Sequence, residues 1–520
     1  MSRLATASKV EVFSLAKPFS NFDFVDDYFQ GRFPIRRLFS QARSREARTV
    51  VMEEIPVAGA VADENAEIAK LFPDYQIQGL RRISFWRSDF KDEKDIPQQD
   101  TKDCLGFAIL KHDFSATKKI NKWHVFESVI VQYPHQHNFL PFANEFEVRV
   151  GGKKFKLSGV LYCQQNELNK ACAQVALRSV CATYLNNANL TYRQINTLAI
   201  RHGEPNTPGK GLNSTQILRV LDGLKIPHYQ IYYPALPHKE KWRAKLPYQK
   251  LIYSGIESGS GALLAFSMAG PRAGDVGHIV PVFGHTFNED TWAPNAEGDY
   301  FQIGHKIRYI PSEAWLSSFI AHDDNFGSNL CIPKDFIKRK RVDFAVALRP
   351  RDFEYPGFVA EIVASDYFYS LLPQLDGRPN RWMKRLEKYV TGRKLILRTV
   401  PNTKADYLTH LGAMADWQGK KESAQTVKDI GGILPERLWV VEVSIPDLFS
   451  TNKRKLGELL LDATRPYTSK GDYSFFVMAR LPGVFAFFDR LDGRKHPRFI
   501  PIDSAIQTHT PVQSVRAPNI

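Results

Sequence analysis

The sequence is poor in cysteine and lacks any cysteine pattern typical of a metal site. Its 520 residues include 5 cysteines at irregular spacing, without a Cys-x-x-Cys pair. An odd number of scattered cysteines argues against a disulfide framework and against a zinc knuckle. Intracellular proteins keep their thiols reduced, so this composition favours a reducing compartment. We therefore expect a cytoplasmic protein without a structural metal.

Long apolar runs are also missing. No stretch of about 18 apolar residues occurs, as a transmembrane helix would need. The first residues, MSRLATASKVEVF, contain no apolar core of a signal peptide. We expect a soluble protein without a membrane span. Hydrophobic residues still make up 43% of the chain, which is normal for globular domains with well-filled cores.

Acidic residues are fewer than basic ones, and the formal net charge is +15. A basic chain favours contact with acidic partners, either nucleic acid or an acidic protein surface. The longest tight basic run is Lys338–Arg341. A solvated surface is a commoner explanation for such a run than a nucleic-acid stripe.

The chain is too long for one ordinary hydrophobic core, so it should divide into domains. Residues 1–158 are β-rich, and Gly151 and Gly152 separate two alternating segments that predict a hairpin. Residues 159–335 place helical patterns before strand patterns. Residues 336–520 alternate strands and helices and predict a mixed α/β C-terminal domain of unknown role.

The central region predicts an α+β domain. Apolar periodicity indicates helices over Cys172–Leu185, from Thr191 towards Arg201, and over Asn213–Leu221. Asn169 is a plausible N-cap of the first helix, and Thr191 begins a capping box. Buried strands follow over Leu263–Met268 and His278–Gly284.

This arrangement puts a cysteine at a helix start, where a thiol can become a nucleophile. Unpaired N–H groups and the helix dipole favour the thiolate, so Cys172 is the candidate nucleophile. Such a thiolate needs a histidine base and an oxyanion donor. His278 is the candidate base, with His285 as its alternative. Gln165 is the candidate donor, and the adjacent glutamine, Gln164, is the alternative.

These residues resemble the papain-like cysteine peptidases, closest to the double-glycine (bacteriocin-processing) branch, over about residues 160–310. The resemblance rests on Gln165, on Cys172 at the start of an apolar helix, and on GHIVPVFGH, in which His278 begins an apolar strand that reaches Gly284. Gln165 lies seven positions before the cysteine, one more than in the family pattern. The bulky Ile279 after the histidine suits the double-glycine branch.

The resemblance implies a papain-like peptidase domain flanked by the two other domains. It implies a third catalytic residue, Asn or Asp, on the strand after the histidine. A hairpin turn near residues 287–290 would place Asn295 opposite His278, with Asp290 as the alternative.

The function implied is that of an intracellular thiol peptidase that cleaves a peptide or isopeptide bond in a protein or peptide substrate, without metal or organic cofactor. The same residue types also serve thiol acyltransferases. A catalytically inactive scaffold that binds nucleic acid or an acidic protein is the alternative of another class.

Overall fold

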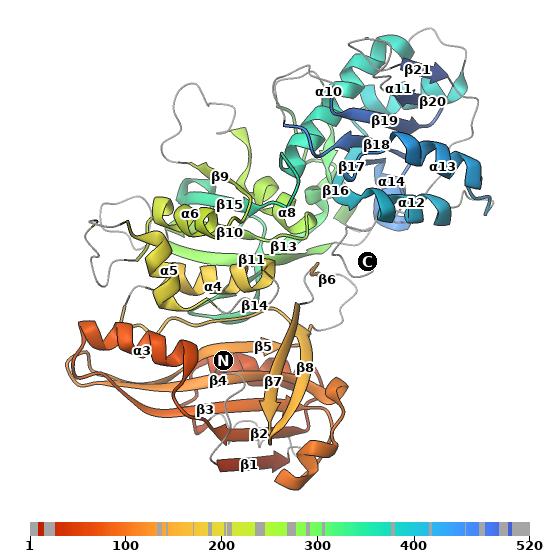
Figure 1. Cartoon of the computed structure of the whole chain (residues 1–520). Helices are drawn as coiled ribbons and strands as arrows, with labels where there is room; N and C mark the ends of the chain where they lie inside the picture. The colour runs from red at the N-terminus through yellow and green to blue at the C-terminus, as the bar shows by residue number, and fades with distance from the viewer. Residues whose placement is uncertain are drawn as a thin grey trace.

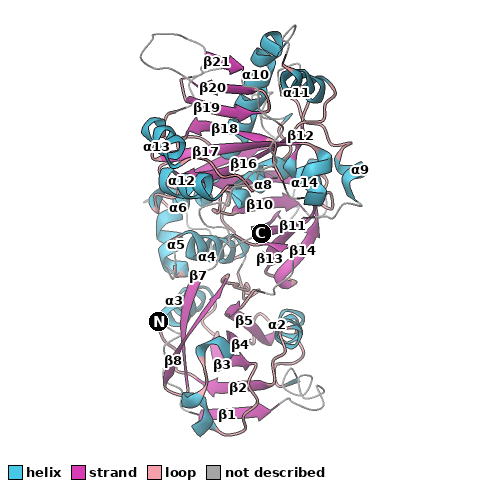
Figure 2. Cartoon of the chain, turned by 90° about the vertical axis from the view of Figure 1, so that its right-hand side faces the viewer, coloured by secondary structure: helices cyan, strands magenta, loops and turns pink. Residues whose placement is uncertain are grey.

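A computed structural model gives the fold of the chain. It describes residues 9–14, 27–132, 138–141, 144–169, 171–185, 190–201, 204, 211–233, 245–267, 277–287, 292–303, 307–375, 380–414, 419–452, 454–466, 474–487 and 498–501. The elements stack in three tiers, each built on a largely antiparallel sheet, with the N-terminal tier at one end and the C-terminal tier at the other (Figure 1, Figure 2). The expected α+β class is confirmed.

The N-terminal tier is an antiparallel sheet with helices at its side. The strands run in chain order: β1 (Lys9–Ser14), β2 (Thr49–Glu54), β3 (Gln76–Trp86), β4 (Cys104–Ser115) and β5 (Ile120–Ile130). Helices α2 (Phe33–Ser44) and α3 (Gly59–Leu71) accompany them. The predicted hairpin is β7 (Asn144–Val150) and β8 (Lys153–Gly159). Its turn needs glycine because Gly151 and Gly152 have φ of 53° and 81°.

The central tier is a sheet in the order β14-β13-β11-β10-β15-β9, with the short β6 (Asn138–Phe139) paired to β11. The strands are β9 (His228–Tyr232), β10 (Ala262–Ser267), β11 (Gly277–Phe287), β13 (Leu316–Asp323), β14 (Gly327–Pro333) and β15 (Val342–Leu348). Helices α4 (Cys172–Tyr184), α5 (Tyr192–Ala199) and α6 (Ser214–Gly223) share one apolar cluster with Leu263 and Ala265. Helix α8 (Tyr248–Glu257) packs with Leu264 and Phe266. The alternation along β10 shows that helices cover both faces of the sheet.

The C-terminal tier also combines a sheet with helices. Its sheet runs β12 (Ile310–Pro311), β16 (Ile396–Thr403), β17 (Arg437–Ser444), β18 (Gly457–Asp462), β19 (Phe476–Leu481), β20 (Val484–Phe487) and β21 (Arg498–Pro501). The accompanying helices are α10 (Gly357–Leu375), α11 (Arg381–Thr391), α12 (Lys404–Ala413), α13 (Ala424–Ile433) and α14 (Pro446–Asn452). No described helix combines the length and the apolar character that a transmembrane span requires.

The predicted central helices and strands form, and both polar helix starts are well capped. Thr191 and Asn213 each make a capping box, in which the side chain accepts from the N3 backbone N–H and the N3 glutamine side chain accepts from the cap N–H. The predicted cap of α4 is wrong. Its N-cap is Ala171, and Asn169 instead lies in a turn where its backbone N–H donates to Asn166.

The central sheet does not stop at the predicted boundary of residue 335. Strand β15, which lies beyond that boundary, inserts between β10 and β9 and pairs with both in antiparallel register. Its sequence, VDFAVAL, is buried almost throughout, as expected for a strand covered on both faces. Conversely, β12 belongs to the central segment of the sequence but joins the C-terminal sheet, where it pairs in parallel with β16.

A buried chain of charges joins the central and C-terminal tiers. Glu257 on α8 accepts from His285 at 2.9 Å and from Arg398 of β16 at 3.0 Å. Arg398 also donates to Glu442 at 3.0 Å, and Lys455 donates to the same carboxylate at 3.2 Å. Burial alone would raise the pKa of Glu257, but Arg398 and His285 hold it below its ordinary value. The interface is therefore fixed by ionised, hydrogen-bonded partners as well as by apolar contact.

Replacing Arg398 by leucine should lower the free energy of unfolding by about 3–5 kcal/mol, because two buried carboxylates lose their shared cation. Urea titration measures the change. Arg437→Leu on β17 is the matched control, since its pair with Asp352 is 3.7 Å long and largely exposed, and it should cost less than about 1 kcal/mol. Equal losses in the two variants would show that the buried chain of charges adds nothing special.

Candidate active site

Cys172 is the first residue of α4 and lines a cleft of 1170 Å³. No side chain among the described residues caps this helix start. The first N–H groups of a helix have no partner within the helix, so those of α4 remain available at the cleft. The N-terminal end of the dipole also favours negative charge there. The position suits both a thiolate and the oxyanion that its attack would create.

His278, near the start of β11, faces this thiol. The Cys172 thiol is one of the neighbours that raise the pKa of the imidazole, and both side chains line the same cleft. Nε2 of the ring lies 3.0 Å from Oδ2 of Asp323, so Nδ1 remains for the thiol. The ring also packs edge-on against Phe266, with centroids 5.5 Å apart. The imidazole is thus held between a sulfur and a carboxylate.

The surroundings of His278 favour its protonated form. Burial alone would lower the pKa, but hydrogen bonds with Asp323 and Cys172 and the nearby charge of Asp324 outweigh it and raise the pKa of His278 to about 10. An imidazolium beside the sulfur at neutral pH stabilises a thiolate. Cys172 and His278 are therefore the candidate nucleophile and the candidate base of this cleft.

Asp323 ends β13 and is held on both sides. Its Oδ1 accepts the backbone N–H groups of Asn325 at 2.8 Å and Phe326 at 3.0 Å, and its carbonyl accepts the Tyr162 hydroxyl at 3.3 Å. Burial would raise the pKa of Asp323, but His278 and the two N–H donors hold it below its ordinary value. An ionised Asp323 can fix the ring orientation and balance the imidazolium charge.

The structure does not bring Asn295, the predicted third residue, to this site. Asn295 lies in the short helix α9 (Ala293–Ala296), and it is not among the residues that line the cleft. The next residue, Ala296, packs with Trp315 and Ile396 instead. Asp290, the alternative, lies outside the described residues.

The reason is the length of the connection after β11. The chain passes through α9, β12 and the 3-10 helix η6 (Ser312–Trp315) before β13 pairs with β11. The partner strand of β11 therefore begins only at Leu316, well beyond the hairpin turn predicted near residues 287–290. The available signal was the apolar stretch Phe319–Ala321 followed directly by His-Asp-Asp-Asn.

Gln165, the predicted oxyanion donor, is half-buried and lines the cleft with Cys172 and His278. Its Nε2 lies 3.5 Å from Oδ1 of Asn325. The alternative, Gln164, is buried and accepts the backbone N–H of Val125 at 2.9 Å, so it has a structural role. Between Gln165 and Cys172 the chain turns, and Glu167 there has a φ of 59°.

His285, the alternative base, and Cys181 are buried and do not line the cleft. His285 is fully buried, bonded to Glu257 and stacked on Phe139. Burial lowers the pKa of His285, so it is not a second imidazolium. Cys181 is also fully buried, which raises its pKa to about 12. Cys331, in contrast, is exposed on β14.

A second carboxylate, Asp324, lies beside the pair. Its Oδ1 is 3.6 Å from Nε2 of His278, and its buried Oδ2 has no hydrogen-bond partner. Burial and the neighbouring charges of Asp323 and Glu167 raise the pKa of Asp324 to about 6, although His278 opposes this. His278, Asp323 and Asp324 could together offer ligand atoms within 4.8 Å of one another to a metal ion. The close His278–Asp323 bond already uses two of these atoms.

Comparison of the chain with known protein families and with curated protein sequences finds no match. The interpretation of the site therefore rests on its own geometry.

Asp324→Asn should stabilise the protein more at pH 7 than at pH 4. The folded-state pKa of about 6 lies above the ordinary value of 3.8, so ionising Asp324 disfavours the folded state as pH rises through this interval. The benefit at pH 7 should exceed that at pH 4 by on the order of 3 kcal/mol in the free energy of unfolding. Asp447→Asn, at an exposed residue of α14, should show no such pH difference. A pH-independent effect of Asp324→Asn would contradict the assignment.

Cys172 should react with iodoacetamide at pH 6, about tenfold faster than the exposed Cys331 measured in the same digest by peptide mass spectrometry. His278→Ala should abolish this advantage. Asp323→Asn should lower the pKa of His278, so the alkaline step of the labelling profile should move from about pH 10 towards neutrality. Equal labelling of both thiols at every pH would rule out an activated pair.

Proposed function

We propose that the protein is a papain-like thiol peptidase whose catalytic residues are Cys172, His278 and Asp323. The observation that carries this proposal is the imidazole held between the thiol at a helix start and a buried carboxylate, all opening on one cleft. Nucleophile, base and orienting group thus stand in the order that acyl transfer requires.

In this mechanism the Cys172 thiolate attacks the carbonyl carbon of the scissile bond and forms a tetrahedral intermediate. The His278 imidazolium gives its proton to the leaving amine as the C–N bond breaks, which leaves a thioester on Cys172. The neutral imidazole then takes a proton from water, which attacks the thioester. Collapse of the second intermediate releases the acid and restores the ion pair.

The oxyanion of each intermediate needs donors in place before it forms. The backbone N–H of Cys172 and Nε2 of Gln165 are suited to this role, because both belong to residues that line the cleft. Gln165 is only weakly engaged by Asn325, at 3.5 Å, so turning towards substrate costs little.

The substrate is proposed to be an extended peptide. The cleft of 1170 Å³ exceeds the range of about 300–1000 Å³ of most small-molecule pockets. Its walls come from two tiers, with Phe72 and Lys118 from the N-terminal sheet domain and Tyr232, Phe326 and Phe344 from the central one. The resemblance to double-glycine peptidases suggests small residues before the scissile bond.

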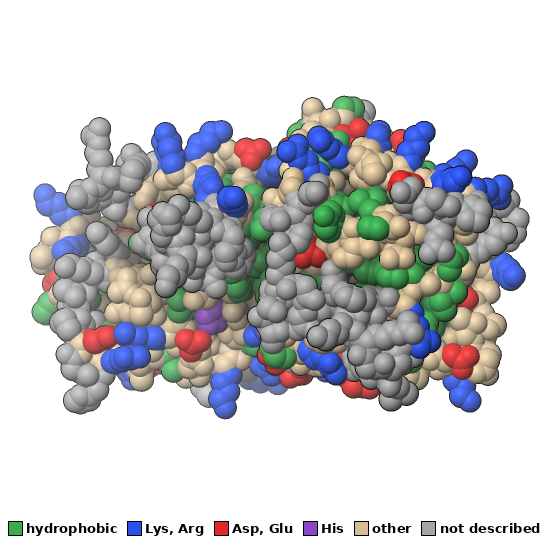
Figure 3. All heavy atoms as spheres, turned by 90° about the horizontal axis from the view of Figure 1, so that it is seen from above, with side chains coloured by type: hydrophobic (Ala, Val, Ile, Leu, Met, Phe, Trp, Pro, Cys, Tyr) green, Lys and Arg blue, Asp and Glu red, His purple; other side chains and the backbone are tan. Residues whose placement is uncertain are grey.

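The alternative of a nucleic-acid-binding scaffold has weaker support. In the face seen in Figure 3, Lys and Arg side chains of the described residues lie in small groups, separated by acidic, apolar and uncharged ones. A backbone-tracking protein needs a continuous basic groove. The cysteines are all free thiols, which supports a reducing compartment such as the cytoplasm as the place of action.

Cleavage of a peptide library that includes Gly-Gly sequences tests the proposal. Cys172→Ala should abolish cleavage, and Gln165→Ala should lower kcat about 100-fold or more through loss of an oxyanion donor. Cys331→Ala should retain full activity. Thioester formation with amide exchange but without hydrolysis would move the protein to the acyltransferases. An inert Cys172 together with no cleavage would favour the binding scaffold.

A further inference from the structure

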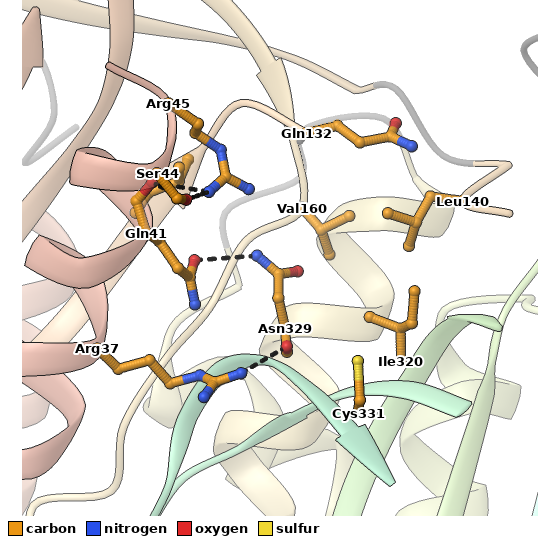
Figure 4. A pocket seen from close by; sticks show the side chains of 12 residues that line it. Arg37, Gln41, Ser44, Arg45, Gln132, Leu140, Val160, Ile320, Asn329 and Cys331 are labelled. Carbon is orange, nitrogen blue, oxygen red and sulfur yellow. Dashed lines mark hydrogen bonds between the residues drawn. The ribbon is translucent and has the colours of Figure 1, made fainter. Parts of the chain in front are cut away.

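Asp323 immediately precedes the turn between β13 and β14, and side chains of the N-terminal domain hydrogen-bond to residues just after this turn. Residues 324–326 connect β13 to β14, and helix α2 of the N-terminal tier packs on β14. Figure 4 shows Arg37 and Gln41 of α2 reaching across to Asn329, with Cys331 farther along the same strand. The third member of the proposed triad is therefore next to a contact between domains.

The contact between α2 and β14 consists mainly of hydrogen bonds to the backbone carbonyls of β14. Arg37 donates from Nε to the carbonyl of Ser328 and from Nη2 to that of Asn329, both at 2.6 Å. Gln41 donates to the Ser328 carbonyl at 2.7 Å, and its Oε1 accepts from the side-chain amide of Asn329 at 3.1 Å. Carbonyl oxygens bound by a guanidinium are charge-assisted partners, stronger than neutral pairs.

Close packing accompanies these bonds at the turn itself. Gly327 has a φ of 101°, and a Cβ there would lie 2.8 Å from Cδ of Arg37. Phe33 of α2 meets Phe326 edge-on, with centroids 6.1 Å apart. The arginine stem therefore fits against a backbone that only glycine can provide.

Two contacts link these hydrogen bonds of α2 to Asp323. The backbone N–H of Asn329 donates to Nδ1 of His322 at 3.1 Å, and His322 immediately precedes Asp323. Burial lowers the pKa of His322 to about 3, so the ring is neutral and Nδ1 can accept. The ring of Tyr162 packs edge-on against His322, while its hydroxyl holds the Asp323 carbonyl.

A cavity of 220 Å³ borders the same contact. Arg37, Gln41 and Asn329 line one side of it, and Leu140, Val160 and Ile320 line the other (Figure 4). Because the apolar side chains do not fill this space, packing between α2 and β14 is incomplete beside the turn. The hydrogen bonds of Arg37 and Gln41 bridge the two elements there.

We propose that Arg37 and Gln41 are positioning residues of the active site: they hold the β13–β14 turn so that Asp323 stays in hydrogen-bond reach of His278. This inference rests on the proposed function, since it concerns the same triad. It makes the N-terminal domain part of the catalytic apparatus, because the turn is supported from outside the central domain.

The test uses the full-length chain and the pH profile of Cys172 alkylation by iodoacetamide between pH 5 and 11. Arg37→Ala should move the alkaline step down by about 1 pH unit or more, towards the position seen in Asp323→Asn. Gln41→Ala should move it in the same direction by less, and Arg37→Lys should recover part of the loss. On a cleaved peptide, kcat should fall about tenfold with KM within twofold.

A double variant separates positioning from general damage. In an Asp323→Asn background, Arg37→Ala should shift the alkaline step no further, because its effect passes through the missing carboxylate. Arg43→Ala, at an exposed arginine of the same helix, should match the wild type. Thermal unfolding followed alongside shows how much each substitution costs in stability.

The outcomes distinguish this inference from the function on which it rests. A wild-type profile without a step that depends on His278 would overturn both. A normal wild-type profile that Arg37→Ala and Gln41→Ala leave in place, with only a lower melting temperature, would overturn the positioning role alone. An additive shift in the double variant would also overturn it.

Discussion

The hydrogen bond between Asp323 and His278 is the interaction on which the proposed chemistry depends. It fixes which ring nitrogen faces the sulfur, and it keeps the ring charged against the cost of burial. Without it, the pKa of His278 would be lower, because burial alone acts in that direction, as it does for His285 and His322 on the same sheet. The three histidines differ because only His278 has two carboxylates within 4 Å of one ring nitrogen.

The protonation of the histidines in the central sheet therefore depends on which carboxylates lie beside them and on whether those carboxylates have another cation as partner. Glu257 meets Arg398 as well as His285, so its charge is already balanced and the imidazole needs no proton. Among the described residues, no arginine or lysine forms an ion pair with Asp323 or Asp324, and His278 is the cation that they face. The two histidines of β11 thus pair with carboxylates from other elements in different ways: His285 is held with a lowered pKa and His278 with a raised one.

Local chemistry made part of this arrangement predictable. Capping residues, the Gly-Gly turn and the apolar strands identify the central elements, because each of these signals acts over a few residues. Cys172, His278 and Gln165 come together as expected, since a helix start and two short motifs define them. Asp323 was missed because the partner of β11 comes only after α9, β12 and η6, and no local pattern reports the length of an insertion. The same limit hid β15, whose sequence looks like any buried strand and does not reveal which sheet it joins.

The exchange of strands between the two sheets governs when each can be completed as the chain emerges from the ribosome. The central sheet has all its strands only once β15 has been made, by residue 348. Strand β12 is made earlier, yet its partner β16 begins at residue 396. The central layer can therefore close before most of the C-terminal sheet has been made, and β12 must wait for a partner. Domains that fold one after another during synthesis suit such an order. Cys172, His278 and Asp323 all belong to the layer that is complete first, so the cleft that they line can form while about a third of the chain is still to be made.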